Sequence, residues 1–237
     1  MIAIHENILY NNAMREIVLD TETTGLDPAQ GHRMVEIGCV ELENHMPTGR
    51  TFQEYLNPEQ EMSEEVIAVH GITNEFVKDK PKFKEIAQKF LDIIGTDSKL
   101  VIHNAAFDMK FLNTELMGAG FKPLSFDRVI DTLIIARQKF PGSRVNLDEL
   151  CKRFKVDASA RTVHGALLDS ELLAEVYLEL IGGREPGLTL GLKHETQRSE
   201  HVFVQKQYHE PRSFPPSDEE LAAHRAFMEK IPNHLWE

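Results

Sequence analysis

The sequence predicts an α/β domain in which a mixed β-sheet is flanked by helices, followed by a tether and a short terminal helix. Three strand-like runs come first, and from residue 83 onward helical and strand patterns alternate. After Gly182 the composition changes to Gly, Pro, Gln and Ser, which predicts that the domain ends close to this point. The length of 237 residues suits one such domain with a tail.

The first half of the domain is expected to hold three consecutive strands that pair as an antiparallel meander. Residues 16–20 form a short apolar run, and residues 34–42 and 50–56 alternate in part between apolar and polar side chains. The elements that follow are a helix over 83–94, a strand over 100–102 and helices near 105–118, 131–139, 146–154 and 165–181.

Composition divides the chain into four segments. Residues 14–183 form the predicted domain, residues 1–13 a predicted disordered extension and residues 184–216 a linker with many chain-breaking Gly and Pro. In the last segment, 217–237, Ser217-Asp218-Glu219-Glu220 has the pattern of a capping box, which predicts a short helix to about Ile231. We interpret this segment as a docking element, with a mobile tail as the alternative.

The net charge of −12 argues against a protein that binds nucleic acid strongly by itself, because phosphate affinity depends on Lys and Arg. Locally the balance is different, since residues 137–161 carry seven basic side chains and three acidic ones. This stretch is either a track for a DNA backbone or a solvated helix face. No run is long and apolar enough for a membrane span, so we expect a cytoplasmic protein. Cys39 and Cys151 stand in apolar patterns and are expected to fill the core.

Acidic residues stand at the places where chemistry is expected. Asp20 and Glu22 are two apart in a strand, so both carboxylates project to one side, where like charges need a cation or protons. A solvated acid pair would be the simpler interpretation of these two alone. Asp108 follows a strand-to-helix crossover at which Asn104 is a plausible N-cap, and Asp169 lies on an amphipathic helix. Oxygen ligands of this kind select hard ions such as Mg²⁺ or Mn²⁺.

Three motifs occur in the order typical of one nuclease family. They are Asp20-Thr21-Glu22-Thr23-Thr24-Gly25, His103-Asn104-Ala105-Ala106-Phe107-Asp108 and His164-Gly165-Ala166-Leu167-Leu168-Asp169, with Val69-His70-Gly71-Ile72 between the first two. In these motifs the chain resembles the DEDDh 3′→5′ exonucleases, and most of all the epsilon subunits of bacterial DNA polymerase III. The resemblance covers about residues 14–183 and implies a ribonuclease H-like fold.

The resemblance also implies the residue roles. Asp20, Glu22, Asp108 and Asp169 would hold two divalent cations, Mg²⁺ or Mn²⁺, and His164 would be the general base, a role that suits an imidazole near neutral pH. The residues expected to bind the terminal nucleotide are Asp20, Glu22, Thr23, Thr24, Glu65, His70, His103, Asn104 and Asp169. Asp131 is predicted to be an N-cap or network acid rather than a metal ligand.

The predicted function is removal of mispaired 3′-terminal nucleotides from DNA as the proofreading exonuclease of a replicative polymerase. Its partners would be single-stranded or mispaired DNA ends and, through residues 217–237, the alpha subunit of DNA polymerase III. Epsilon subunits carry a glutamine-headed clamp-binding peptide after Gly-Gly, but here the run from Arg184 to Leu190 that follows Gly182-Gly183 contains no glutamine, so binding of the sliding clamp through Leu188 and Leu190 stays open. The alternatives are an RNA-trimming relative and a non-catalytic scaffold, although a scaffold needs no base at His164.

Overall fold

The computed structural model describes residues 14–182, 215–228 and 230. The chain divides into two units, Met1–Leu188 and Thr189–Glu237, and each is described by itself. The predicted extension 1–13 lies outside the described residues, as does the predicted linker up to residue 214, including Leu188 and Leu190.

The first unit is built on one five-stranded sheet with the strand order β3-β2-β1-β4-β5. Its strands are β1 (Arg15–Thr23), β2 (Met34–Glu43), β3 (Met46–Tyr55), β4 (Lys99–Ile102) and β5 (Val129–Asp131). The first three pair antiparallel, and β4 and β5 extend the sheet in parallel from β1. The predicted mixed sheet and meander are therefore confirmed. The strand β5 was not predicted, because three residues show no periodicity.

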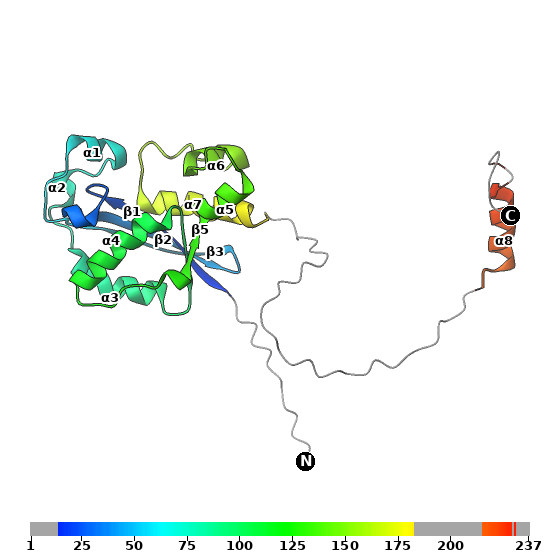
Figure 1. The fold of residues 1–237 in the computed structure, drawn as a ribbon, viewed down its shortest axis with the longest axis horizontal. Helices are drawn as coiled ribbons and strands as arrows, with labels where there is room; N and C mark the ends of the chain where they lie inside the picture. The colour runs from blue at the N-terminus through cyan, green and yellow to red at the C-terminus, as the bar shows by residue number, and fades with distance from the viewer. Residues whose placement is uncertain (1–13, 183–214, 229, 231–237) are drawn as a thin grey trace, which may run out of the picture. The chain divides into compact units, whose positions relative to one another are not determined.

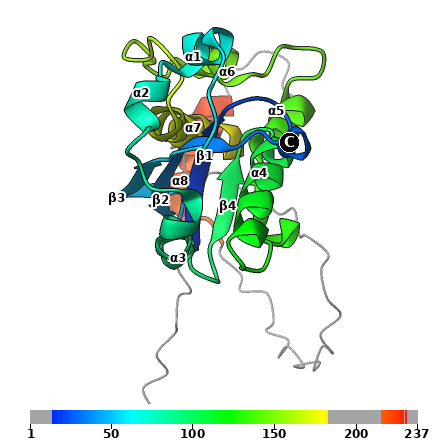
Figure 2. The same cartoon turned by 90° about the vertical axis from the view of Figure 1, so that its left-hand side faces the viewer.

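Helices cover both faces of this sheet, as Figures 1 and 2 show. They are α1 (Glu64–His70), α2 (Asn74–Val77), α3 (Phe83–Ile94), α4 (Ala105–Gly118), α5 (Thr132–Lys139), α6 (Leu147–Phe154) and α7 (Ala166–Ile181), with short 3₁₀ turns at Pro28–Gln30 and Phe126–Arg128. The helices predicted between residues 83 and 181 are all present, with bounds that agree within one residue. The four-residue α2 was not predicted.

The alternation of side chains along β1 decides which helix meets which face. Ile17 and Leu19 pack in one core with the buried faces of α3 and α4. Val18 points to the opposite face and packs in a second core against Leu173 and Tyr177 of α7. A strand buried on both faces reads as a continuous apolar run, which is the pattern of residues 17–19.

The two cysteines are free and buried, as predicted. Cys39 belongs to the core beneath α3 and α4, and Cys151 packs among α5, α6 and α7. No helix within the described residues is both long enough and apolar enough to cross a membrane.

The second unit contains α8 (Asp218–Met228). The predicted capping box is present, since the Ser217 backbone N–H donates to the Glu220 carboxylate at 2.8 Å and the Glu220 N–H donates to Ser217 Oγ at 3.3 Å. The helix ends at Met228, earlier than the predicted end near Ile231. No side chain of α8 is buried, and Phe227 is 61% exposed.

Candidate active site

One pocket of about 400 Å³ brings the predicted chemistry together. It is lined by all four predicted metal ligands, by the predicted base and by two further residues that were predicted to bind the nucleotide: Asp20, Glu22, Asp108, Asp169, His164, His103 and Asn104. These residues come from β1, from α4 and the turn before it, and from α7 and the loop before it. Tertiary folding thus assembles three sequence motifs that are up to 149 residues apart, from Asp20 to Asp169.

The alternation of side chains along β1 explains how acids from both faces of the sheet meet in the pocket. Asp20 and Glu22 share the side of Val18, which is the side covered by α7. Thr21 points toward the α4 side, and its hydroxyl donates to Asp108 Oδ1 at 2.8 Å. Asp108 is 3% exposed and reaches the pocket from the first turn of α4. The hydroxyl of Thr21 therefore orients the acid that comes from the opposite face.

The start of α7 is held against the sheet by β2. A Cβ atom on Gly38 would lie 2.3 Å from the Ala166 carbonyl carbon, so only glycine permits this close approach. The buried Glu36 carboxylate accepts from the Ala166 backbone N–H at 3.0 Å and supplies the cap that the Gly165 side chain cannot. The Ser170 hydroxyl donates to the Gly38 carbonyl oxygen at 3.1 Å. These contacts fix the helix turn that carries Asp169.

Arg161 is the cationic member of the pocket, and its side chain is only 9% exposed. Its guanidinium donates two hydrogen bonds to Asp169, from Nε to Oδ1 at 2.5 Å and from Nη2 to Oδ2 at 2.6 Å. Its Nη1 forms an ion pair with Asp148, a residue of α6 that also lines the pocket. In the sequence Arg161 belongs to the basic stretch 137–161 and was not predicted as a site residue, although it stands three residues before His164.

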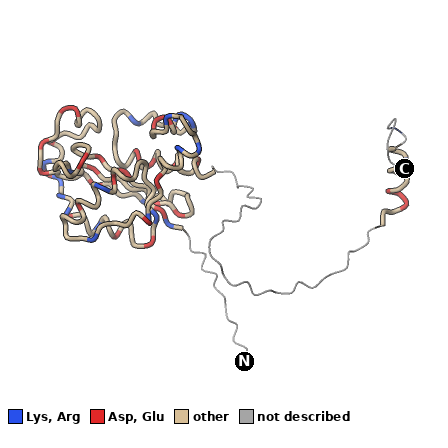
Figure 3. Tube along the Cα trace, viewed as in Figure 1, with Lys and Arg blue, Asp and Glu red and all other residues tan. Residues whose placement is uncertain are grey.

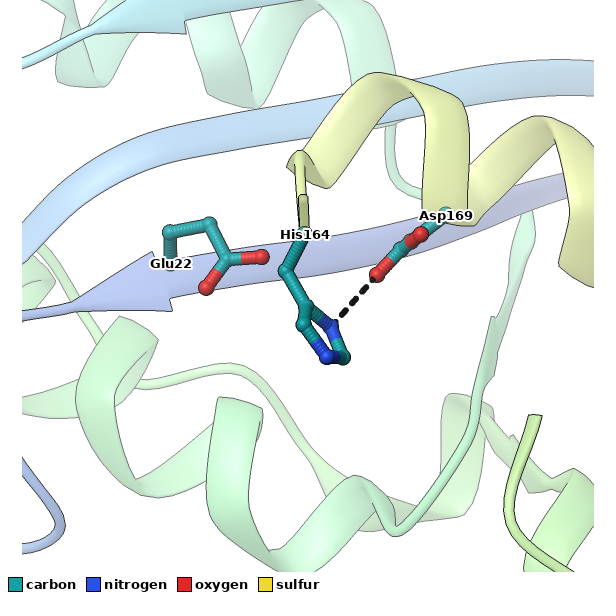
Figure 4. Close-up of side chains that lie close together, drawn as sticks. All are labelled: Glu22, His164 and Asp169. Carbon is teal, nitrogen blue, oxygen red and sulfur yellow. Dashed lines mark hydrogen bonds and ion pairs between the residues drawn. The ribbon is translucent and has the colours of Figure 1, made fainter. Parts of the chain in front are cut away.

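His164 faces Asp169 and Glu22 from the loop before α7, as Figure 4 shows. Its Nδ1 lies 3.2 Å from Asp169 Oδ2 and 2.7 Å from Arg161 Nη2. Its backbone N–H donates to the Val69 carbonyl oxygen at 3.1 Å, which ties this loop to the end of α1. The hydrogen bond to Asp169 raises the pKa of His164 above its usual 6.5. With a side chain 47% exposed, the imidazole can meet a ligand in the pocket.

Burial and mutual repulsion make the acids costly as bare anions. Burial is the main cause that raises the pKa of Glu22 from 4.5 to about 8. Burial, followed by the charges of Asp108, Glu22 and Asp169, raises the pKa of Asp20 well above its usual range. The pKa of Asp108 is also raised, chiefly by burial. Carboxylates that repel one another in a buried pocket fit hard divalent cations, which would remove this repulsion.

The turn before α4 differs in one detail from the prediction. Asn104 occupies the N-cap position with φ of 67°, but its side chain makes no capping bond. The Asp131 carboxylate accepts instead from the backbone N–H groups of Asn104 and Ala105, each at 3.2 Å, and from that of Leu133 at 2.9 Å. Asp131 therefore caps both α4 and α5, which confirms its prediction as an N-cap acid. His103 Nδ1 lies 2.9 Å from Thr132 Oγ1, which fixes its ring at the pocket.

Four predicted nucleotide-binding residues do not line this pocket. The Thr23 hydroxyl donates to the Gly25 carbonyl oxygen, and the Thr24 hydroxyl accepts from the Arg33 N–H, so both stabilise the turn after β1. Glu65 is exposed on the first turn of α1. His70 is 4% exposed, and its Nδ1 accepts from the Ile72 N–H at 3.0 Å. The roles of these four residues as nucleotide contacts stay predictions.

Within the basic stretch 137–161, several side chains are engaged by the fold. Lys139 donates to the last carbonyls of α7, Arg153 lies over the Phe140 ring at 4.3 Å and Arg161 binds Asp169. Figure 3 shows basic residues gathered at α6, and Arg137, Arg144 and Lys155 are exposed. The exposed side chains fit either a track for a DNA backbone or a solvated helix face, so both interpretations stay open.

This chain is similar in sequence and fold to known proteins. The exonuclease family of the RNase T type matches residues 17–177. The DNA polymerase III epsilon subunit of Rickettsia felis is 52% identical over 225 residues, covering 93% of this chain and 98% of that protein. The epsilon subunit of Escherichia coli is 43% identical over 228 residues, covering 92% and 93%. The chain belongs to the DNA polymerase III epsilon family of exonucleases.

Solved exonuclease structures have a similar fold. The nuclease domain of 3′hExo, a DEDDh family member bound to rAMP, aligns with a TM-score of 0.61 at 24% identity, covering 72% of this chain and 93% of that one. Exonuclease X in complex with 5′-overhanging duplex DNA aligns with a TM-score of 0.54 at 25% identity, covering 70% and 90%. The predicted ribonuclease H-like architecture of this epsilon-type chain is confirmed.

Proposed function

We propose that this chain is the proofreading exonuclease of a replicative DNA polymerase and removes mispaired nucleotides from 3′ ends. The family match and the epsilon-subunit relatives support a 3′→5′ DNA exonuclease. The observation that carries the proposal is the convergence of Asp20, Glu22, Asp108, Asp169 and His164 in one pocket. A scaffold would have no need for an imidazole beside these acids.

The acids have the donor chemistry for the metal ions on which DEDDh exonucleases depend. In this proposal Asp20, Glu22, Asp108 and Asp169 hold two divalent cations, Mg²⁺ or Mn²⁺. Bound ions of this kind stabilise the attacking and leaving oxygens of an in-line phosphodiester displacement. The chain itself contributes the fixed positions of the acids, because Thr21 orients Asp108 and the packed start of α7 orients Asp169.

His164 is the proposed general base. Its ring lies beside the acids and is partly exposed to the pocket, so Nε2 can accept the proton of the attacking water when Nδ1–H faces Asp169. The bond from its backbone N–H to Val69 places the base next to α1. The proposed contacts to the terminal nucleotide are His103 and Asn104 in the pocket, Glu65 and His70 on α1, and Thr23 and Thr24 at the end of β1.

Substrate preference tests this function directly. We expect hydrolysis to begin at a 3′ end and to be faster on single-stranded or mispaired DNA than on matched duplex, since a matched end must first unpair at a cost of a few kcal/mol. The measurement is product analysis with end-labelled single strands, matched duplex, mispaired duplex and RNA, with and without Mg²⁺. Internal fragments, digestion from the 5′ end or a preference for RNA would contradict the proposal.

The tail is proposed to bind the alpha subunit of DNA polymerase III. The acidic chain would bind DNA weakly alone, and a tethered partner that holds the primer end raises the effective concentration to the millimolar range. The exposed α8, with Phe227 as an aromatic anchor, supports a docking role for residues 217–237.

Truncation after Gly183 should leave hydrolysis of short single strands nearly unchanged, because every residue of the pocket lies before this point. The same truncation should abolish co-purification with the alpha subunit. Phe227→Ala in the full chain is the milder variant, with His224→Ala on the same helix as the control. If the truncated protein binds alpha with the affinity of the full chain, the docking site lies in the catalytic unit.

A further inference from the structure

We propose that Arg161 is a built-in counter-cation that holds the catalytic site in a resting arrangement and competes with divalent metal for Asp169. This inference rests on the proposed metal-dependent function. It assigns Arg161 a positioning role that neither the family match nor the relatives' names describe.

The contacts of Arg161 show that it occupies the ligand atoms that a metal would need. Its two bonds to Asp169 use both carboxylate oxygens, at 2.5 and 2.6 Å. The Asp169 side chain is only 5% exposed, so few directions remain from which another ligand can approach its carboxylate oxygens. A planar guanidinium paired in this bidentate way is among the strongest arrangements for a carboxylate. A divalent ion can therefore bind Asp169 fully only where the guanidinium gives up at least one bond.

The same guanidinium constrains the proposed base. Arginine N–H groups can only donate, so the 2.7 Å contact from Nη2 favours the neutral tautomer in which His164 Nδ1 accepts, whereas the 3.2 Å contact with Asp169 is a hydrogen bond only when Nδ1 carries a proton. The neutral ring then carries its proton on Nε2, which has no free lone pair and therefore cannot act as the base. When Arg161 withdraws, Nδ1–H can face Asp169 and Nε2 is free to act as base. Arg161 therefore couples the state of the metal ligand to the tautomer of the base.

Asp148 provides the place to which Arg161 can withdraw. It forms an ion pair with Nη1, on the side of the guanidinium away from the bonds to Asp169. Asp148 is 54% exposed on α6, so this pair lies at the rim of the pocket and stays available after Asp169 is released. Without a metal, Arg161 also offsets the repulsion among the acids, because its guanidinium binds Asp169 and pairs with Asp148. Arg161 thus stabilises the metal-free pocket and withdraws toward Asp148 at the rim when metal binds.

The test measures metal binding without substrate. Mn²⁺ is titrated into the full-length wild type and Arg161→Gln, and free Mn²⁺ is followed by electron paramagnetic resonance. Competition predicts that Arg161→Gln binds Mn²⁺ about tenfold more tightly, within the usual range for coupled binding events. The metal-free variant should melt at a lower temperature than the wild type, and saturating Mn²⁺ should raise its melting temperature by more than that of the wild type.

Two further variants separate the explanations. Lys122→Gln removes an exposed positive charge outside the pocket and should leave Mn²⁺ affinity unchanged. Arg161→Lys keeps the charge without the planar fork and should fall between the wild type and Arg161→Gln; it also serves if Arg161→Gln does not fold. Equal or weaker Mn²⁺ binding by both Arg161 variants would overturn the proposal, because Arg161 would then orient Asp169 for the metal. If no protein binds Mn²⁺, the proposed metal function fails as well.

Discussion

Asp20→Ala is expected to remove nearly all hydrolysis while leaving the fold intact. Asp20 is a proposed metal ligand, and its pKa is raised first by burial and then by the charges of three neighbouring acids. Its removal therefore costs the chain a ligand but also relieves repulsion, so the metal-free protein should be at least as stable as the wild type. Release of labelled nucleotide from single-stranded DNA in Mg²⁺ measures the first effect, and thermal unfolding in chelator measures the second.

The matched control is Asp92→Ala, which removes an exposed acid on α3 and should keep wild-type activity. Asp169→Ala should be as inactive as Asp20→Ala but less stable, because it breaks both bonds to the largely buried Arg161. Substantial hydrolysis by Asp20→Ala, or full wild-type activity in excess chelator, would refute the assignment of these acids as metal ligands.

His164→Ala is expected to lower kcat by roughly 10²–10⁴, the usual contribution of a positioned general base. Metal binding should change less, since four carboxylates remain. In the wild type the rate should rise with pH, because only the deprotonated imidazole accepts a proton. The midpoint is expected above 6.5, because the bond to Asp169 raises the pKa of His164 and so extends the protonated form to higher pH. Measuring kcat over this pH range in both proteins checks the assignment.

His224→Ala is the control for this substitution, because it removes an exposed histidine on α8, outside the catalytic unit. It should leave both kcat and the pH profile unchanged. If His164→Ala keeps the rising limb of the profile, another group activates the water, and His164 has only a structural role in the loop that is tied to Val69.

The amino-acid sequence alone predicted most of the helices and strands, although not α2 and β5, and it pointed to the acids and the histidine that line one pocket. Apolar periodicity is a local property, so the helices from Phe83 to Ile181 and the first three strands follow from it. The capping box at Ser217 is equally local. The acids and His164 were found because three short motifs occur together, and the structure brings them into one pocket.

Tertiary structure alone decided how these residues act on one another. The approach of α7 to Gly38, the cap that Glu36 gives this helix and the bond from Thr21 to Asp108 join residues that are far apart in the chain. Arg161 is the clearest case. In the sequence it is one of seven basic residues in the stretch 137–161, and its charge alone suggests a DNA contact. Folding buries it between Asp169 and Asp148, where the cost of burying a charge makes ion pairing necessary. Pairing of this kind depends on distance in space, which periodicity and composition do not contain.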